Sequence, residues 1–342
     1  LSELLPHMVR TFEIRLIIPD FPGERPAMDG VTYVALPLIP FLKSGDLRFP
    51  LVRSSMIRSQ VGWADMVWTH TAAGIGGACI KQAHKLNKPI VSMVHSNEWV
   101  IYSKTLRFGK TLGMRAWLSI AKSRYNLANL IITPGEMTRK ELLHAGIKPK
   151  IQVVPLGVSL QRFHPLPSQE RLSHLERIGL PSELPIIGYL GRFAEEKSLN
   201  TLIAAHKILS RDCPTRLLLV GGTRSQLPRG RLLDTVIVKG PTTEPQLFFQ
   251  AMDVFVLPSL TESFPLGILE AMACGIPPVT TPVGATTSYI IHAKNGYLFP
   301  PKKDGVLAET LRACLASSER RKKVGEEARR TVEKGFSWEG SA

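Results

Sequence analysis

The loop formed by residues 261–275 combines two carboxylates with a helix start, and this combination suits a phosphorylated ligand. The loop follows Val254–Leu257, an apolar run that is typical of a buried strand. It then begins a helix, whose free backbone N–H groups and positive dipole end favour an anion such as a diphosphate. Glu262 and Glu270 suit hydroxyl groups of a sugar and of a ribose, on either side of that diphosphate. For either glutamate alone, a solvated charge near a helix start is the alternative interpretation.

A second loop places two cations after another predicted strand. Residues 191–197 form the sequence Gly-Arg-Phe-Ala-Glu-Glu-Lys and follow directly on the apolar run Ile186–Leu190. Arg192 and Lys197 are suited to neutralising a leaving diphosphate without a metal ion, which makes both of them catalytic candidates. The alternative is that they are surface charges paired with Glu195 and Glu196.

Short apolar runs alternate with helical patterns along the whole chain, which is typical of an α/β fold. The hydrophobicity within these runs is continuous, as expected for parallel strands buried on both faces. Ser198 is the expected N-cap of the helix that follows it, Pro265 suits a first helical turn, and Gly275 suits a helix end. The predicted strands cover 12–18, 31–36, 66–69, 90–94, 130–133 and 151–154 in the first half, and 186–190, 216–220, 236–238, 254–257 and 278–281 in the second.

The length of 342 residues fits two domains of about 150 residues each. Two sets of alternating strands and helices predict two doubly wound, Rossmann-like domains, at residues 1–158 and 159–342. The segment 155–167, with its prolines and glycine, is the expected linker. A domain of this kind usually opens with a strand and a glycine-rich turn, and neither precedes the strand at 12–18. The last residues enter a helix that stops at Ala342, so we expect both ends to be truncated.

The composition is that of a globular protein with a surplus of basic residues. Apolar residues make up 44% and charged residues 21%, which excludes a disordered or low-complexity chain. Lysine and arginine number 43 against 28 acidic residues, a net charge of +15, so anionic partners are expected. Four scattered cysteines indicate reduced thiols rather than disulfides or a zinc site. Because we find neither a membrane-spanning apolar run nor a secretory signal, we expect a cytoplasmic protein.

Taken in order, these motifs resemble glycosyltransferase family 4, the retaining nucleotide-sugar enzymes of GT-B fold. The second half shows a Gly-Arg…Lys loop at 191–197, a strand that ends in Pro258-Ser259, and glutamates eight positions apart. The similarity continues through Pro282-Val283-Gly284, residues 295–301 and the interdomain segment at 154–165. The resemblance implies two doubly wound domains that face a cleft, with the acceptor side in 1–158 and the nucleotide-sugar donor side in 159–342.

The resemblance also implies roles for individual residues. Arg192 and Lys197 would hold the donor diphosphate, Glu270 the ribose, and Glu262 the transferred sugar together with nearby backbone amides. The implied catalytic set is His95, Glu262, Lys197 and Arg192, and the implied donor-binding set is Arg192, Lys197, Glu262, Phe264, Pro265, Leu266, Gly267 and Glu270. His95 matches a histidine that points into the cleft, and His70 is a weaker candidate. No metal site and no cofactor are implied beyond the nucleotide sugar as co-substrate.

Three positions depart from the family pattern. Pro265 stands where a glycine often follows the aromatic residue, which suggests a stiffer phosphate loop. Ser198 stands where a glycine commonly follows the lysine. Residues 285–289 lack the acidic residue that is common after Gly284, which leaves donor contacts there open.

The implied reaction is retaining transfer of a hexose from a UDP- or GDP-sugar to a lipid, lipid-linked or glycan acceptor, in glycolipid or cell-envelope biosynthesis. The segment between Glu98 and Glu136, called the basic window below, contains no acidic residue. It predicts a membrane surface as a further partner. Basic and aromatic residues together suit docking on anionic lipid headgroups, so we expect a peripheral protein on the inner face of the membrane. The basic residues of this window are Lys104, Arg107, Lys110, Arg115, Lys122 and Arg124.

Three alternatives differ in class. The basic window also suits a nucleic-acid-binding module, but no nucleic-acid-reading motif is present and the donor loops would have no role. A non-catalytic fragment of a glycosyltransferase is the second alternative. The third is a nicotinamide enzyme, because residues 74–78 form a glycine-rich segment that opens a helix. Cys79 occupies the third glycine position of that fingerprint, and Glu98 is the carboxylate about 20 residues further on.

Overall fold

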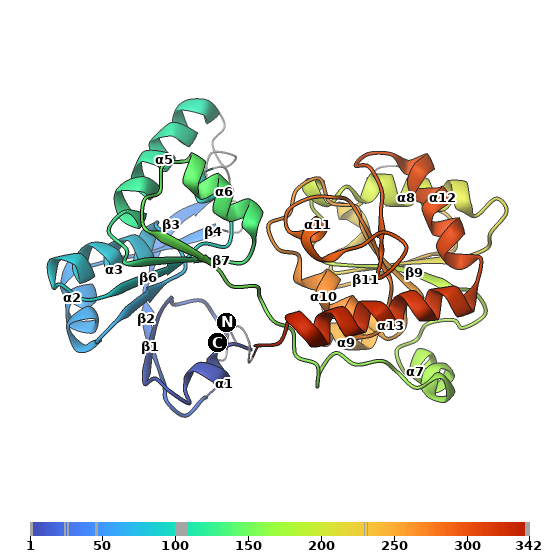
Figure 1. The fold of residues 1–342 in the computed structure, drawn as a ribbon, viewed down its shortest axis with the longest axis horizontal. Coiled ribbons are helices and arrows are strands. Elements are labelled where there is room, and N and C mark those ends of the chain that lie inside the picture. Colours follow the sequence, from blue (N-terminus) through green and yellow to red (C-terminus); the bar gives the residue numbers. More distant parts are fainter. Residues whose placement is uncertain are drawn as a thin grey trace. The chain divides into compact units, whose positions relative to one another are not determined.

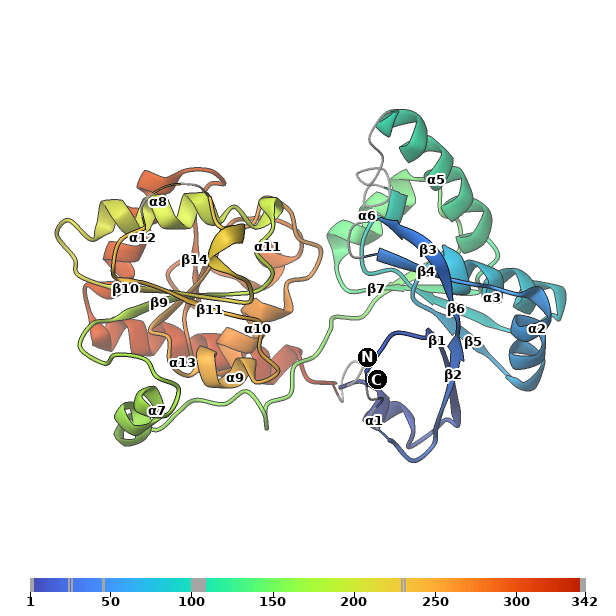
Figure 2. The same cartoon turned by 180° about the vertical axis from the view of Figure 1, so that it is seen from behind.

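The computed structural model describes residues 3–23, 25, 27–44, 47–99, 109–228, 230 and 232–338. The chain divides into two compact units, Leu1–Pro155 and Leu156–Ser341, and each is described by itself. Figures 1 and 2 show the elements of both units from opposite sides.

The second unit is built on a parallel sheet with the strand order β11-β10-β9-β12-β13-β14. Because β9 is the first of these strands in the chain and lies between β10 and β12, the direction of strand order reverses there. Ligands of open α/β sheets bind beyond the carboxyl ends of the strands at such a reversal. The strands are β9 (Ile186–Leu190), β10 (Arg216–Val220), β11 (Val236–Lys239), β12 (Val254–Leu257), β13 (Pro278–Thr280) and β14 (Tyr297–Leu298).

Helices cover both faces of this sheet. One face carries α8 (Leu199–Leu209) and α12 (Asp304–Leu315), and the other carries α9 (Pro245–Phe249), α10 (Leu266–Ala273) and α13 (Ser318–Gly335) (Figures 1 and 2). The central strands are buried accordingly: all four residues of β12 and the last four of β10 are buried. This burial confirms the prediction that continuous apolar runs form parallel strands buried on both faces. The shorter helices are α7 (Arg171–Arg177) and α11 (Thr286–Tyr289).

The first unit contains every strand predicted there, but its parallel strands fall into two sheets. Four of them form a parallel sheet in the order β5-β6-β7-β8, and β1 pairs only with β2 among the described residues. An antiparallel pair of β3 and β4 was not predicted, because Pro40 interrupts the apolar pattern of β3. The strands are β1 (Ile14–Pro19), β2 (Val31–Leu36), β3 (Leu38–Ser44), β4 (Leu47–Pro50), β5 (Val67–Thr69), β6 (Ile90–Met93), β7 (Leu130–Thr133) and β8 (Lys150–Val153).

Five helices of the first unit are described: α1 (Leu5–Met8), α2 (Ser54–Trp63), α3 (Gly74–Lys85), α5 (Lys110–Tyr125) and α6 (Glu136–His144). The first unit has its own buried core, which includes Leu36, Ile80, Tyr125 and Ile131. Across the described parts of the chain, we find no helix with both the length and the apolar composition that crossing a bilayer requires.

Ser198 departs from its predicted role. It occupies the N-cap position of α8, but its φ of +51° is left-handed and its hydroxyl contacts Thr201 Oγ1 at 2.9 Å instead of a backbone N–H. A side-chain cap needs an extended backbone at this position, so the predicted capping bond is wrong. A left-handed backbone is also the conformation that glycine adopts at no steric cost, so Ser198 stands at a position that favours glycine.

Candidate active site

Lys197 and Glu262 meet in the second unit, at the carboxyl ends of two neighbouring strands. Lys197 ends the loop after β9, and Glu262 lies in the loop after β12. The ammonium Nζ of Lys197 donates to Oε1 of Glu262 at 2.6 Å, and the two side chains are only 18% and 12% exposed. The fold therefore brings together the two residues that the sequence places on separate loops, at the point where strand order reverses.

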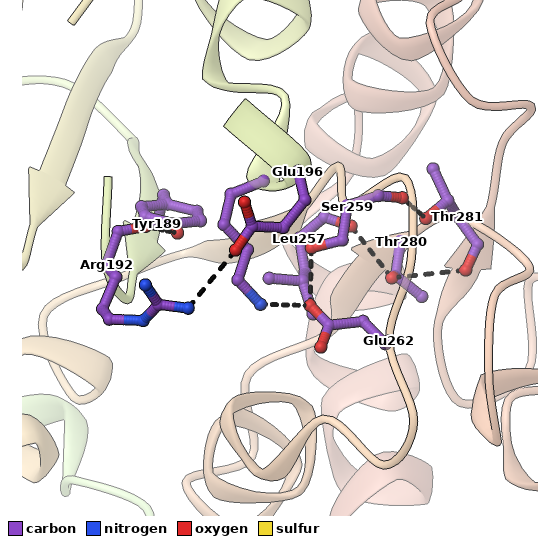
Figure 3. A network of polar contacts seen from close by, with 9 residues as sticks. Tyr189, Arg192, Glu196, Leu257, Ser259, Glu262, Thr280 and Thr281 are labelled. Atoms are coloured by element: carbon purple, nitrogen blue, oxygen red, sulfur yellow. Dashed lines mark hydrogen bonds and ion pairs between the residues drawn. The ribbon is translucent and has the colours of Figure 1, made fainter. Parts of the chain in front are cut away.

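The carboxylate of Glu262 is fixed by a second donor. The Ser259 hydroxyl donates to the same oxygen, Oε1, at 2.6 Å (Figure 3). Ser259 is itself held through its carbonyl, which accepts a hydrogen bond from the Thr281 hydroxyl at 2.5 Å, and both residues are fully buried. The neighbouring Thr280 hydroxyl donates to the Leu257 carbonyl at 3.0 Å. The turn that carries Glu262 is thus fastened to the end of β13, and the carboxylate has little freedom to rotate.

Arg192 lies differently from Lys197. Its guanidinium is 80% exposed and forms an ion pair with Glu196 at 3.3 Å (Figure 3). Its backbone is held, because the Tyr189 hydroxyl donates to the Arg192 carbonyl at 2.7 Å. Arg192 therefore forms the surface ion pair that the sequence offered as the alternative interpretation. Its loop nevertheless lies at the end of β9, as predicted. Among the described residues, the ion pair of the Arg192 guanidinium is with Glu196 and not with Glu262.

Two glycines bring these loops close to neighbouring backbone. Gly221, after β10, has a φ of +116°, and a Cβ there would lie 2.3 Å from the Gly191 carbonyl oxygen. Gly284 has a φ of +59°, and a Cβ there would lie 2.3 Å from the Glu262 carbonyl oxygen. No larger residue fits at either position without moving the loop beside it. Gly221 was not predicted as part of the site, although a Gly221-Gly222 pair directly after a strand is a usable signal.

The start of α10 supplies backbone donors beside Glu262. Pro265 occupies the N-cap position rather than the first turn, and its carbonyl accepts the Ile268 N–H at 3.1 Å. Leu266 and Gly267 form the first turn, where N–H groups have no intrahelical acceptor. Pro265 itself has no N–H to offer a ligand. At the other end of α10, Gly275 is left-handed with a φ of +72°, which confirms its predicted place at the helix end.

Phe264 and Glu270 occupy different environments. The Phe264 ring packs in an aromatic cluster with Tyr289 and Phe336, at centroid distances of 5.9 and 6.1 Å. Its side chain thus anchors the loop in a hydrophobic cluster. Glu270 is half-buried on α10. Burial, together with the charge of Glu270, raises the pKa of the Cys274 thiol to about 12.

In the first unit the two histidine candidates contact each other. His70 follows β5 and His95 follows β6, and these strands are neighbours in the sheet. His70 Nδ1 and His95 Nε2 lie 2.9 Å apart, with the ring planes inclined by only 8°. Burial, and then the charge of His95, lowers the pKa of His70 to about 4, and burial also lowers the pKa of His95. Both rings are therefore neutral at pH 7, with one acting as donor and the other as acceptor.

The glycine-rich segment at 74–78 packs against its own chain. It opens α3 after β5, as predicted. A Cβ at Gly76 would lie 2.1 Å from the Thr71 carbonyl oxygen, and one at Gly77 would lie 2.2 Å from that of Ala72. Glu98 accepts hydrogen bonds from the Ala72 N–H and from the Tyr125 hydroxyl, the latter at 2.8 Å. The glycines and Glu98 thus have local packing and hydrogen-bonding roles.

The basic window is described only in part. Lys104 and Arg107 lie outside the described residues. The remainder forms α5, which begins at Lys110 after Gly109 in a left-handed conformation. α5 exposes Leu112 by 74% and Ile120 by 38%. In the described portion of the chain, we find no cluster of histidine, cysteine or acidic side chains with metal-ligand geometry.

Comparison with known proteins identifies relatives for both units. The family described as "Glycosyltransferase Family 4" matches residues 1–162, and the family described as "Glycosyl transferases group 1" matches residues 171–331. The chain is 29% identical to a D-inositol 3-phosphate glycosyltransferase from Xylanimonas cellulosilytica, over 94% of this chain and 82% of that protein. It is 28% identical to a GDP-mannose-dependent alpha-mannosyltransferase from Mycobacterium tuberculosis, over 87% and 78%.

Two solved structures share the fold. Sucrose-phosphate synthase from Thermosynechococcus elongatus matches with a TM-score of 0.73 at 20% identity, over 98% of this chain and 88% of that chain. Anabaena HepE in complex with UDP-glucose matches with a TM-score of 0.73 at 18% identity, over 90% and 82%. These likenesses confirm the GT-B fold that the motif order implies.

Proposed function

The chain belongs to the group 1 and family 4 glycosyltransferases, and from this membership we propose that it transfers a hexose from a UDP- or GDP-sugar, with retention, to a lipid, lipid-linked or glycan acceptor. The contact between Lys197 and Glu262, at the strand-order reversal of the second unit, carries the proposal. It joins a cation suited to a diphosphate and a carboxylate suited to sugar hydroxyls within one hydrogen bond. The half of the chain that holds this pair is the half that matches the group 1 family.

The donor is assigned to the second unit. Lys197 holds the diphosphate, and Arg192 reaches it by swinging from its exposed pair with Glu196. Glu262 binds the transferred sugar, with the amides of Leu266 and Gly267 and the backbone of Phe264 beside it. Glu270 binds the ribose. The names of two relatives support a nucleotide sugar of this kind, one being GDP-mannose-dependent and one bound to UDP-glucose.

The chemistry follows from charge that develops on the leaving diphosphate. The bond from the anomeric carbon to the phosphate oxygen breaks, the sugar becomes oxocarbenium-like, and the negative charge grows on the departing phosphate. A preorganised ammonium and helix-start amides stabilise that charge more than they stabilise the bound donor. Retention is explained by attack of the acceptor hydroxyl on the face that the diphosphate leaves, with the phosphate helping to remove the proton.

The acceptor is assigned to the first unit, at an anionic membrane surface on the cytoplasmic side. The apolar side chains that α5 exposes support this assignment, because Leu112 and Ile120 lie on the same helix as Arg115, Lys122 and Arg124. Basic and apolar side chains on one helix attract anionic headgroups and enter the headgroup boundary. His95, with His70 beside it, is the proposed acceptor-side catalytic residue.

A donor and acceptor panel tests the proposal. Release of nucleoside diphosphate is measured with UDP- and GDP-hexoses, in the presence of diacylglycerol, a polyprenyl phosphate, an oligosaccharide or a phosphorylated cyclitol. Turnover with a lipid, lipid-linked or glycan acceptor is expected, and it is expected to depend on Lys197. Turnover with the phosphorylated cyclitol alone would contradict the acceptor class, and no sugar transfer with any donor would contradict the reaction. Equal sedimentation with anionic and neutral vesicles would contradict the membrane surface.

A further inference from the structure

An apolar pocket of about 400 Å³ lies in the first unit between α3, α5 and the loop after β5. Its volume is within the range of about 300–1,000 Å³ that small-molecule sites occupy. Small residues at 72–74, 77 and 78 leave the space open, and Trp117 and Ile120 of α5 form the opposite wall. A narrow crevice beside it shares Trp117 and Ile120 and is also lined by Glu98 and Trp99.

Two cations lie on the wall of this pocket. Lys81 is exposed on α3, four residues after Gly77 and therefore on the same face of the helix. Arg124 of α5 donates from Nη1 to the Gly77 carbonyl at 3.1 Å, while its Nε is buried without a hydrogen-bond partner. Neither cation forms an ion pair with a carboxylate of the described residues. The nearby carboxylate of Glu98 is engaged instead by Tyr125 and the Ala72 amide.

The charge of the Arg124 guanidinium is not compensated by a carboxylate of the described residues. Burial lowers the pKa of Arg124, which reflects the cost of removing its charge from water. A bound anion would offset that cost, because charge-assisted hydrogen bonds are about twice as strong as neutral ones. Apart from the two cations and the indole N–H of Trp117, the groups that line the pocket are apolar or lack a side chain, so the pocket suits a hydrocarbon chain. The lining therefore calls for a ligand that is anionic at one end and apolar at the other.

We propose that this pocket binds the alkyl chain of an anionic lipid, with the lipid phosphate held by Arg124 and Lys81. This proposal specifies how the chain would bind the membrane, and it rests on the membrane association that the proposed function includes. It differs from headgroup attraction to the surface of α5, because one chain would leave the bilayer and enter the protein. Gly77 lines the pocket and lets α3 approach the loop after β5, because a Cβ there would lie 2.2 Å from the Ala72 carbonyl oxygen.

Calorimetric titration with dodecyl phosphate, below the concentration at which it forms micelles, tests the proposal without any sugar donor. Binding to the intact chain is expected, and Arg124→Gln and Ala78→Phe are each expected to weaken it at least about tenfold. Lys85→Gln removes an exposed charge one turn beyond Lys81 and is the matched control, with unchanged affinity expected. Dodecyl maltoside and inorganic phosphate are expected to bind at least tenfold more weakly than dodecyl phosphate.

Absence of dodecyl phosphate binding would overturn the proposal, as would equal affinity for dodecyl maltoside or for inorganic phosphate. Unchanged affinity in both Arg124→Gln and Ala78→Phe would do so as well. If Ala78→Phe does not fold, judged by its thermal midpoint, the smaller Ala78→Leu takes its place. No sugar donor is present in this experiment, so its outcome is independent of the transferase assay. If dodecyl phosphate binds but no sugar is transferred, the lipid pocket is supported and the proposed reaction is contradicted.

Discussion

Lys197 and Glu262, 65 positions apart in the chain, share a hydrogen bond of 2.6 Å at the carboxyl ends of β9 and β12. Ser259 donates to the same oxygen of Glu262, so the carboxylate keeps one partner when the lysine is removed. Under the proposed function, a diphosphate that binds Lys197 would compete with Glu262 for the ammonium group. Donor binding would then release the carboxylate toward the sugar.

Replacing Lys197 by alanine is expected to lower the rate of sugar transfer by at least about 100-fold, because one preorganised charge on the leaving group is lost. The free energy of unfolding is expected to fall by about 1–3 kcal/mol, since Glu262 loses one of two donors. Rates are measured by diphosphate release and stability by urea unfolding. Lys207→Ala, at an exposed position of α8, is the control and should change neither. Near-normal turnover in Lys197→Ala would contradict the site.

Gly284→Ala is expected to disturb the loop that carries Glu262. The left-handed backbone alone costs an alanine about 1–2 kcal/mol, and the added Cβ would lie 2.3 Å from the Glu262 carbonyl oxygen. We therefore expect lower stability and a raised KM for the donor. Gly305→Ala is the matched control, because it lies in α12 with open space around it and should stabilise the helix by about 0.5–1 kcal/mol. An unchanged KM for the donor in Gly284→Ala would contradict a role of Gly284 in positioning the Glu262 loop.

Stability of the first unit is expected to depend on His70 between pH 6.5 and 4. Its pKa is about 4 in the folded chain and about 6.5 when unfolded, so the unfolded state binds the proton first. The contribution is fully present above pH 6.5 and is lost as the pH falls toward 4, amounting to roughly 3 kcal/mol. Thermal midpoints measured from pH 7.5 to 4.5 should fall less steeply in His70→Gln. His84→Gln, at an exposed position of α3, should follow the unmodified chain. Identical slopes for all three proteins would contradict the assignment.

Gly77→Ala is expected to destabilise the first unit by more than about 1 kcal/mol, because the added Cβ would lie 2.2 Å from the Ala72 carbonyl oxygen. Gly62→Ala, inside α2 with nothing within 4 Å, should instead stabilise the chain by about 0.5–1 kcal/mol. The two midpoints are compared by thermal unfolding. Equal effects of both substitutions would show that Gly77 is not kept small by packing.

The sequence alone predicted every parallel strand of the first unit and five of the six described in the second, because a strand buried on both faces is apolar, as β12 is. The two-residue strand β14 was not predicted, because it is too short to form an apolar run. The antiparallel pair of β3 and β4 was not predicted, because Pro40 interrupts its pattern. The capping bond predicted for Ser198 was wrong, because backbone handedness at one residue is set by the loops that meet there. The family resemblance came from the order of short motifs, each of which is weak on its own.

What the sequence determined is therefore chemical identity and order: Lys197 after one strand, Glu262 and Glu270 after another, and two histidines after two more. Only the tertiary structure decided which of them meet. It joined Lys197 to Glu262 and His70 to His95, left Arg192 with Glu196 in solvent, and turned the Phe264 ring into a hydrophobic cluster. The reason is physical: strand neighbours come from sheet topology, and the close approach of loops comes from glycines whose contacts lie far away in the chain.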